Sequence, residues 1–235
     1  MKQIDEYKVY VFDLDGTLYD QPKLRKIMAI RLAKYYLTHP LRLSELMVLK
    51  EFRSIKDKWG ELDKADCEKS EIDDISLYGL DETDIEICRY IAIKSGRSIS
   101  YISRIIKRWI YDNPLSAVYK SRDAKLIDYI EQLRKAGKYV CVWSDYPTKD
   151  KLSAMECQVD AQYSSTDSRI KELKPSSKGL KCIIEDTKAD LSDVIMIGDR
   201  YEKDGKAAIE AGVDYVILPR KVSKRDIDKM IKVED

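Results

Sequence analysis

Four short runs of apolar residues divide this chain, and much of the sequence between them repeats apolar residues at helical spacing. The runs are Val9–Phe12, Tyr139–Trp143, Val194–Ile197 and Tyr215–Leu218. Unbroken apolar runs of this length are typical of strands buried on both faces, as in a parallel sheet covered by its crossover helices. The pattern therefore predicts an α/β fold built on a doubly wound parallel sheet.

The stretch from about residue 20 to residue 118 differs, because helical periodicity replaces the strand signals. Helices are expected from about residue 21 to before Pro40, from Ser44 to near Gly60, over about 81–96, and from Ser98 to before Pro114. A proline disfavours helical backbone in the residue before it, which gives the first and last of these helices their ends. We therefore predict a core domain made of 1–19 and 119–235, with a helical domain inserted at 20–118.

Beyond residue 118, helices are expected to alternate with the strands, over about 121–136, from about 148, and over 177–187, 202–211 and 223–232. The segment that leads to Lys174 and Pro175 is expected to be irregular. A strand, helix, strand order of this kind produces parallel neighbours, whose carboxyl ends share one edge of the sheet.

Polar residues follow three of the apolar runs directly. Asp13 and Asp15 follow the first run, Ser144 and Asp145 the second, and Asp199 the third. In open α/β sheets ligands bind beyond the carboxyl ends of the strands, so these residues are expected to meet there. An aspartate can attack phosphorus, a second acid can move protons, and a hard cation can bind between carboxylates.

Each of these residues also has a structural interpretation. Ser144 and Asp199 are typical caps of a following helix, and Asp204 suits the first turn of a helix, where the dipole stabilises a carboxylate. Lys174 has two neighbours that could replace it, Lys171 and Lys178.

Taken together and in order, the motifs resemble those of the haloacid dehalogenase superfamily of phosphohydrolases, in its helical-cap branch. Asp13-Leu14-Asp15-Gly16-Thr17-Leu18 matches the first family motif, Ser144 the second, Lys174 before Pro175 the third, and the segment from Gly198 to Asp204 the fourth. The resemblance covers the whole chain and implies a Rossmann-like core with an inserted α-helical cap.

The resemblance also implies roles for the acids. Asp13 would be the nucleophile that takes the phosphoryl group. Asp15 would protonate the leaving oxygen and then activate the water that cleaves the aspartyl-phosphate. Mg²⁺ would be held by Asp13, by the backbone carbonyl of Asp15 and by Asp199, with Asp204 supporting the site from behind.

The phosphoryl oxygens would be held by Ser144, by Lys174 and by the backbone N–H groups of Leu14 and Asp145. Two features depart from the family pattern. Asp145 stands where many relatives carry asparagine, and the segment before Lys174 lacks the glycine often found there.

The resemblance favours a Mg²⁺-dependent phosphatase that acts on a small phosphorylated metabolite. A sugar phosphomutase of the same fold would use the same residues, and a protein that binds phosphorylated ligands without catalysis is an alternative of another class. A dehalogenase is less favoured, because its chemistry does not call for the second acid, Asp15.

Composition adds limits on partners and location. The chain has 43 Lys and Arg against 42 Asp and Glu and a net charge of +1, so we expect no nucleic-acid and no membrane partner. Its five cysteines are odd in number and have no Cys-x-x-Cys spacing, which favours reduced thiols in a cytoplasmic protein. The single histidine, His39, lies in a helix-stop context and leaves little for histidine-based catalysis.

Charge is distributed unevenly within the helical insertion. Residues 23–58 hold ten basic and three acidic residues, 61–86 hold two basic and eleven acidic, and 89–110 hold six basic and no acidic. These runs are either ordinary solvated helix faces or a basic wall that attracts phosphorylated substrates, and the sequence leaves both interpretations open.

Overall fold

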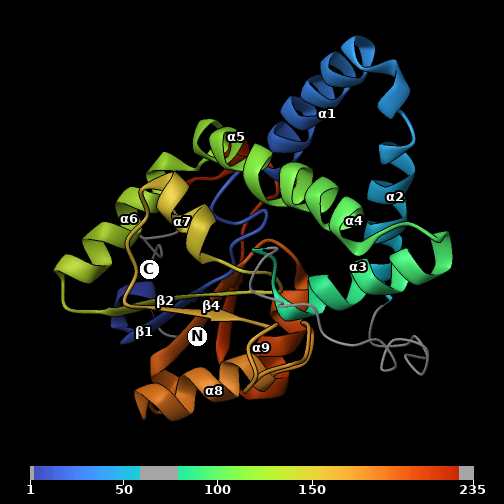
Figure 1. Cartoon of the computed structure of the whole chain (residues 1–235). Coiled ribbons are helices and arrows are strands. Elements are labelled where there is room, and N and C mark those ends of the chain that lie inside the picture. The colour runs from blue at the N-terminus through green and yellow to red at the C-terminus, as the bar shows by residue number, and fades with distance from the viewer. Residues whose placement is uncertain (1–2, 59–78, 228–235) are drawn as a thin grey trace. The chain divides into compact units, whose positions relative to one another are not determined.

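The computed structural model describes residues 3–58 and 79–227. The chain divides into two compact units, one formed by Met1–Arg25 and Ser116–Asp235 and the other by Lys26–Leu115. We call them the core unit and the cap unit. Two helices, α1 (Gln21–Thr38) and α5 (Asn113–Ser121), run across the division (Figure 1).

The core unit is built on a five-stranded parallel sheet with the strand order β3-β2-β1-β4-β5. Its strands are β1 (Val9–Phe12), β2 (Tyr139–Ser144), β3 (Ala161–Ser164), β4 (Val194–Gly198) and β5 (Asp214–Ile217). In the register of the sheet Phe12 lies opposite both Val142 and Ile197, so β1, β2 and β4 end side by side. The predicted doubly wound parallel sheet is confirmed.

The sequence pattern missed β3, which lies in the segment expected to be irregular. This strand pairs with β2, with Ala161 opposite Cys141 and Ser164 opposite Ser144. It is an edge strand of the sheet and is buried only at Ser164. A half-exposed edge strand needs no apolar run, which is why its four residues carry no strong strand signal.

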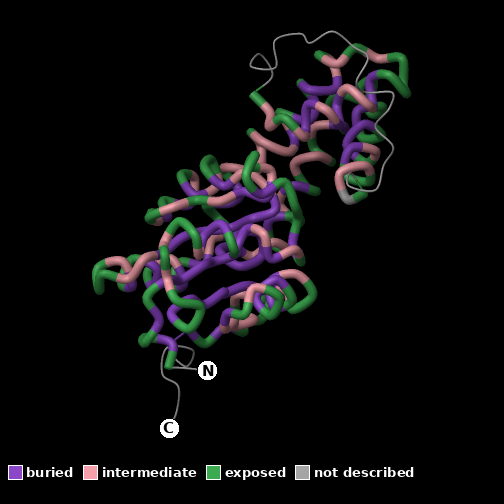
Figure 2. Tube along the Cα trace, turned by 90° about the horizontal axis from the view of Figure 1, so that it is seen from below, coloured by how far each residue is buried: buried purple, intermediate pink, exposed green. Residues whose placement is uncertain are grey.

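Helices cover both faces of this sheet. The helices α8 (Lys178–Thr187) and α9 (Lys206–Ala211) lie on one face, and α6 (Ala124–Lys135) and α7 (Lys149–Met155) on the other (Figure 1). The three central strands β1, β2 and β4 are buried almost throughout, as Figure 2 shows, whereas the edge strands β3 and β5 are mostly half-buried. The core beneath α8 and α9 contains Val9, Val11, Cys141, Trp143, Leu180, Ile183, Val194, Met196, Ala207 and Ala208.

The cap unit is helical, as the periodicity predicts. It contains α2 (Glu45–Asp57), α3 (Glu82–Ser95), α4 (Ile99–Ile106) and most of α1. Side-chain caps begin two of these helices: Asp81 accepts a hydrogen bond from the Asp84 amide, and Ser98 from the Tyr101 amide. These are the hydrogen bonds that the first turn of a helix otherwise lacks. Much of the acidic run over 61–86 lies outside the described residues.

The helix expected to end before Pro114 does not end there. After α4 the chain continues through a π-helical segment, Lys107–Asp112, directly into α5, so that Pro114 is the second residue of α5. Proline is tolerated near a helix start, and a π-helical turn can shift the backbone hydrogen bonds past it. The expected end was therefore wrong.

Two expected helices of the core unit also differ. The one over 202–211 begins as a π-helical turn, Tyr201–Gly205, before α9. The one over 223–232 does not begin where expected, because Val222–Lys224 forms a 3-10 turn and Arg225 is extended. Ile227 is helical, and the remainder of that prediction, 228–232, lies outside the described residues. Across the described ranges, no helix combines the length and the apolar character needed to span a membrane.

Candidate active site

The polar residues predicted at the strand ends do meet at the carboxyl edge of the core sheet, and all of their side chains are buried. Residue exposure lies between 0% and 7% for Asp13, Asp15, Ser144, Asp145, Lys174, Asp199 and Asp204. Buried charges are stable only when they are paired, so the contacts within this group decide what it can do.

Asp13 lies between a lysine and a hydroxyl group. The Lys174 ammonium donates to Asp13 Oδ1 at 2.6 Å, and the Thr17 hydroxyl donates to Oδ2 at 2.9 Å. Burial raises the pKa of Asp13 to about 7, against the lowering effect of the Lys174 ammonium. The side chain is thus close to the balance between its acid and carboxylate forms at neutral pH.

Lys174 joins two carboxylates. Its ammonium group also donates to Asp204 Oδ1 at 2.8 Å and lies 4.9 Å from the centre of the Trp143 ring. Burial alone would lower the pKa of Lys174, but Asp13 and Asp204 outweigh burial and raise it. By contrast, Lys178 is half exposed and pairs with Glu172 at 3.2 Å. Lys174, and not Lys178, is therefore the lysine that contacts Asp13.

A cation would fit beside Asp13, Asp199 and Asp204, whose oxygens lie within 4.8 Å of one another. Both oxygens of Asp204 already accept hydrogen bonds, from Lys174 Nζ and, at 3.0 Å, from the Arg200 amide. Asp199 Oδ1 is buried and has no hydrogen-bond partner within the described part of the chain. Arg200 Nε lies 3.6 Å from this oxygen, beyond hydrogen-bond distance. Asp199 therefore keeps an oxygen that could bind a metal, whereas both oxygens of Asp204 already accept hydrogen bonds.

Two glycines allow these acids to come so close. A Cβ atom on Gly16 would lie 2.6 Å from Asp199 Oδ2, and one on Gly198 would lie 2.4 Å from the Asp204 side chain. Gly16 also has a φ of 104°, which residues with a side chain rarely adopt. Any side chain at either position would move an acid out of the cluster.

Asp15 is held by three donors from three segments. Tyr19 donates its hydroxyl to Asp15 Oδ1, Lys151 donates its ammonium to the same oxygen at 2.6 Å, and Ser144 donates to Oδ2 at 3.3 Å. Burial alone would raise the pKa of Asp15, but Lys151, Tyr19 and Ser144 together lower it. These three contacts therefore favour its carboxylate form over its acid form.

Asp145 braces the loops around the site. Its Oδ1 accepts the Lys174 amide at 2.9 Å, and its Oδ2 accepts the Lys203 ammonium at 2.7 Å. An asparagine could not accept from a lysine through its NH₂ group, so the aspartate found here matches its local partners. This arrangement fixes the backbone of Lys174 relative to the end of β2.

Sequence reasoning missed four residues that contact the predicted ones. Thr17 lies inside the first motif and gave a signal through that motif alone. Lys203 likewise lies inside the fourth motif and gave a signal through that motif alone. Tyr19 and Lys151 gave none, because each is a common residue in a loop or helix and its contact with Asp15 appears only in the folded chain.

Comparison with known proteins agrees with this architecture. Residues 7–212 match a family model described as haloacid dehalogenase-like hydrolase. No curated protein matches the sequence.

Three solved structures illustrate the likeness of fold. The HAD-hydrolase YfnB from Bacillus subtilis, solved with magnesium, is 14% identical, with a TM-score of 0.55 and coverage of 90% of this chain and 88% of that one. The 2-haloacid dehalogenase from Pseudomonas syringae pv. tomato DC3000 is 14% identical, with a TM-score of 0.58 and coverage of 90% and 86%. A predicted phosphoglycolate phosphatase from Haemophilus somnus 129PT is 18% identical, with a TM-score of 0.50 and coverage of 91% and 85%.

Proposed function

Because the chain belongs to the haloacid dehalogenase-like hydrolase family, we propose that it is a Mg²⁺-dependent phosphatase that hydrolyses a small phosphorylated metabolite. The observation that most supports this proposal is the second buried carboxylate, Asp15. It lies in the same sequence motif as Asp13, and three hydrogen-bond donors hold its side chain. An alcohol leaves phosphorus readily only when its oxygen is protonated, whereas a halide leaves carbon as a stable anion. A positioned second acid therefore favours phosphoester chemistry over dehalogenation.

In the first half of the proposed reaction, an oxygen of Asp13 attacks phosphorus while the bond from phosphorus to the leaving oxygen breaks. The reaction starts from the form in which Asp15 has taken up a proton, although its contacts favour the carboxylate, and Asp15 gives this proton to that leaving oxygen. In the second half, the Asp15 carboxylate takes a proton from water as the water oxygen attacks phosphorus, and the bond to Asp13 breaks. Both acids return to their starting states.

The remaining residues stabilise charge. The Ser144 hydroxyl, the Lys174 ammonium and the backbone N–H groups of Leu14 and Asp145 are proposed to hold the phosphoryl oxygens. Phosphoryl transfer depends mainly on such positioning and on stabilising charge at these oxygens. When bound, Mg²⁺ would supply further positive charge there, with Asp13, Asp199 and the Asp15 carbonyl as its proposed ligands and Asp204 as the acid behind them.

The proposed setting is the cytoplasm, with a small molecule as the substrate. Four cysteines in the described part of the chain, Cys88, Cys141, Cys157 and Cys182, are buried free thiols. Thiols that remain unpaired support a reducing compartment.

A panel of phosphorylated metabolites tests the proposal directly, with phosphate release measured in Mg²⁺ and in excess chelator. Release that requires Mg²⁺ and disappears in Asp13→Asn is expected. Chloride release from 2-chloropropionate is measured in parallel. Chloride release without phosphate release would show that the chain is a dehalogenase. Full phosphatase activity in chelator or in Asp13→Asn would overturn the mechanism.

A further inference from the structure

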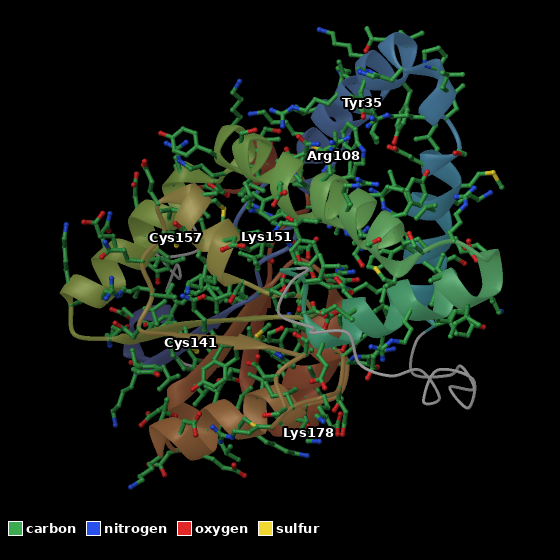
Figure 3. All side chains as sticks on the ribbon, in the orientation of Figure 1. Tyr35, Arg108, Cys141, Lys151, Cys157 and Lys178 are labelled. Carbon is green, nitrogen blue, oxygen red and sulfur yellow. The ribbon has the colours of Figure 1, made fainter. Side chains whose placement is uncertain are left out.

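We propose that Lys151, acting through Asp15, is a positioning residue that fixes which oxygen of Asp15 faces the reacting phosphoryl group. This inference rests on the proposed phosphatase function. Lys151 lies on α7, outside all four sequence motifs, and is marked in Figure 3. Its ammonium is 2.6 Å from Asp15 Oδ1.

The two oxygens of Asp15 have different surroundings. Oδ1 accepts hydrogen bonds from both Lys151 and Tyr19, whereas Oδ2 has only the longer contact to Ser144. A carboxylic acid proton must be on an oxygen that is free of strong donors. Oδ2 is therefore the oxygen that would carry the transferred proton, and it lies beside Ser144, which is proposed to bind the phosphoryl group.

Positive charge in the site is divided between two lysines. Lys174 contacts Asp13 and Asp204, while Lys151 is the lysine in contact with Asp15 among the described residues. Each lysine therefore holds one member of the catalytic pair. Neither has to change its protonation state for this role, since Lys151 acts only as a donor to Oδ1.

The burial of the pair separates it from an ordinary surface ion pair. The Asp15 side chain is 7% exposed and that of Lys151 is 21% exposed. Exposed ion pairs often contribute nothing measurable. Here the carboxylate would have to give up two donors to turn, so removal of Lys151 would leave its orientation dependent on Tyr19 alone at that oxygen.

A misoriented Asp15 would affect some substrates more than others. Proton transfer matters most when the leaving group is a weak acid, and little when it departs readily as an anion. Phenyl phosphate and 4-nitrophenyl phosphate have nearly the same shape but differ in this respect, because the nitro group makes the leaving phenol a much stronger acid. A loss of proton transfer should therefore fall mainly on phenyl phosphate.

The test compares kcat and KM for these two esters in Lys151→Met, Lys151→Arg, Tyr19→Phe and Asp15→Asn, with Mg²⁺ present. The matched control is Lys149→Met, which removes an exposed lysine from the same helix. In Lys151→Met we expect kcat for phenyl phosphate to fall about 10²-fold, within the range for acid–base catalysis and no further than in Asp15→Asn. The loss for 4-nitrophenyl phosphate should be at least about tenfold smaller, with KM little changed.

The other variants complete the expectation. Lys151→Arg, which keeps a charged donor, should recover most of the loss, and Tyr19→Phe should show a smaller loss with the same preference. Equal losses for both esters in Lys151→Met, or a change no greater than in Lys149→Met, would overturn the inference.

Failure of the proposed function looks different. If Asp13→Asn keeps its activity, or if the unaltered protein hydrolyses neither ester, the phosphatase proposal itself fails, and this inference fails with it. If Lys151→Met does not fold, Lys151→Gln, which keeps a neutral donor, takes its place and must show the same difference between the esters.

Discussion

Lys174 is the buried lysine that contacts the carboxylates of the candidate active site in the core unit. Its ammonium contacts Asp13 and Asp204, which would otherwise repel each other and an anionic substrate. Removal of a single buried partner leaves its acids uncompensated, which is the costly way to break such a group. The lysine is therefore expected to matter for binding and rate together.

Lys174→Ala should lower kcat/KM by about 10²-fold or more, as loss of one charge-stabilising donor does in other enzymes. Both kcat and KM should worsen, because the charge faces phosphate before and during transfer. Lys171→Ala and Lys178→Ala are the matched controls, since both residues lie outside the cluster. Steady-state kinetics of all three variants measure this. A large loss in either control with none in Lys174→Ala would mean that Lys174 is not the motif lysine.

Asp13 sets a second expectation at the scale of one residue, because burial raises its pKa to about 7. An aspartate side chain binds Mg²⁺ in its ionised form, so Mg²⁺ has to displace the proton wherever Asp13 still carries one. As pH rises from about 6 to 8, Mg²⁺ affinity should increase and then level off once Asp13 has ionised. Below the pKa of Asp13 the slope should approach tenfold per pH unit.

Calorimetric titration of Mg²⁺ into the protein at several pH values measures this slope, and the heat in different buffers reports the released proton. Asp13→Asn, which has no proton to lose at this position, is the control and should show a flatter dependence. An affinity that does not change over this range would show that Asp13 does not bind the metal.

At the scale of elements, hydrogen bonds join the loop after β1 to Arg225, which lies in the segment after β5. Arg225 donates to the Gly16 carbonyl at 2.5 Å, to the Thr17 carbonyl at 2.6 Å and to Asp123 Oδ2 at 2.9 Å. Asp123 also caps α6 by accepting from the Leu126 amide. One buried guanidinium thus joins the catalytic loop, the start of α6 and the segment after β5.

Arg225→Met should lower the free energy of unfolding by about 3–5 kcal/mol, because it leaves Asp123 buried without its partner. Lys224→Met, which changes an exposed neighbour, should change that free energy by about 0.5 kcal/mol or less. Urea unfolding measures both. The double variant Arg225→Met with Asp123→Asn should regain part of the loss. If it regains none, the loss comes from the carbonyl contacts and not from the unpaired acid.

At the scale of the whole molecule, the chain has two units with different tasks in the proposed function. All four motifs lie in the core unit, so that unit is proposed to bind the phosphoryl group and the metal. The cap unit carries basic residues, of which Arg104 and Lys107 are exposed and Arg108 donates to the Tyr35 hydroxyl at 2.7 Å. We therefore propose that the cap unit selects the rest of the substrate.

Charge reversal at Arg104, Lys107 or Arg108 should therefore change KM for a charged metabolite several-fold and leave the hydrolysis of 4-nitrophenyl phosphate nearly unaltered. Lys125→Glu, an exposed charge reversal on α6 of the core unit, is the control. The ratio of the two kcat/KM values is the quantity to compare. If no cap variant changes that ratio, while substitutions at Asp145 or Tyr146 do, specificity belongs to the core loops.

The sequence by itself determined the parallel sheet and the position of the acids along it. Unbroken apolar runs are typical of strands buried on both faces of such a sheet, and β1, β2 and β4 lie where their runs predict. Asp13 and Asp199 directly follow β1 and β4, and Ser144 is the last residue of β2, so their position at one edge follows from the shared direction of these strands. The helices of the inserted segment could be predicted in the same way, because the spacing of apolar residues along a helix is a property of the local sequence.

Only the tertiary structure decided the features that depend on distant partners. The edge strand β3 is a strand because it pairs with β2, although only one of its own residues is buried. The chain passes Pro114 as helix because a π-helical segment precedes it.

The side chains that contact the active-site loop and its aspartates were also decided only by the tertiary structure. Lys151 reaches Asp15, and Arg225 reaches Gly16, across sequence separations of 136 and 209 residues that no local pattern records. A buried strand can be predicted from local sequence, because its burial requires apolar residues at neighbouring positions. A lysine or arginine has many possible partners, and only the folded chain selects one.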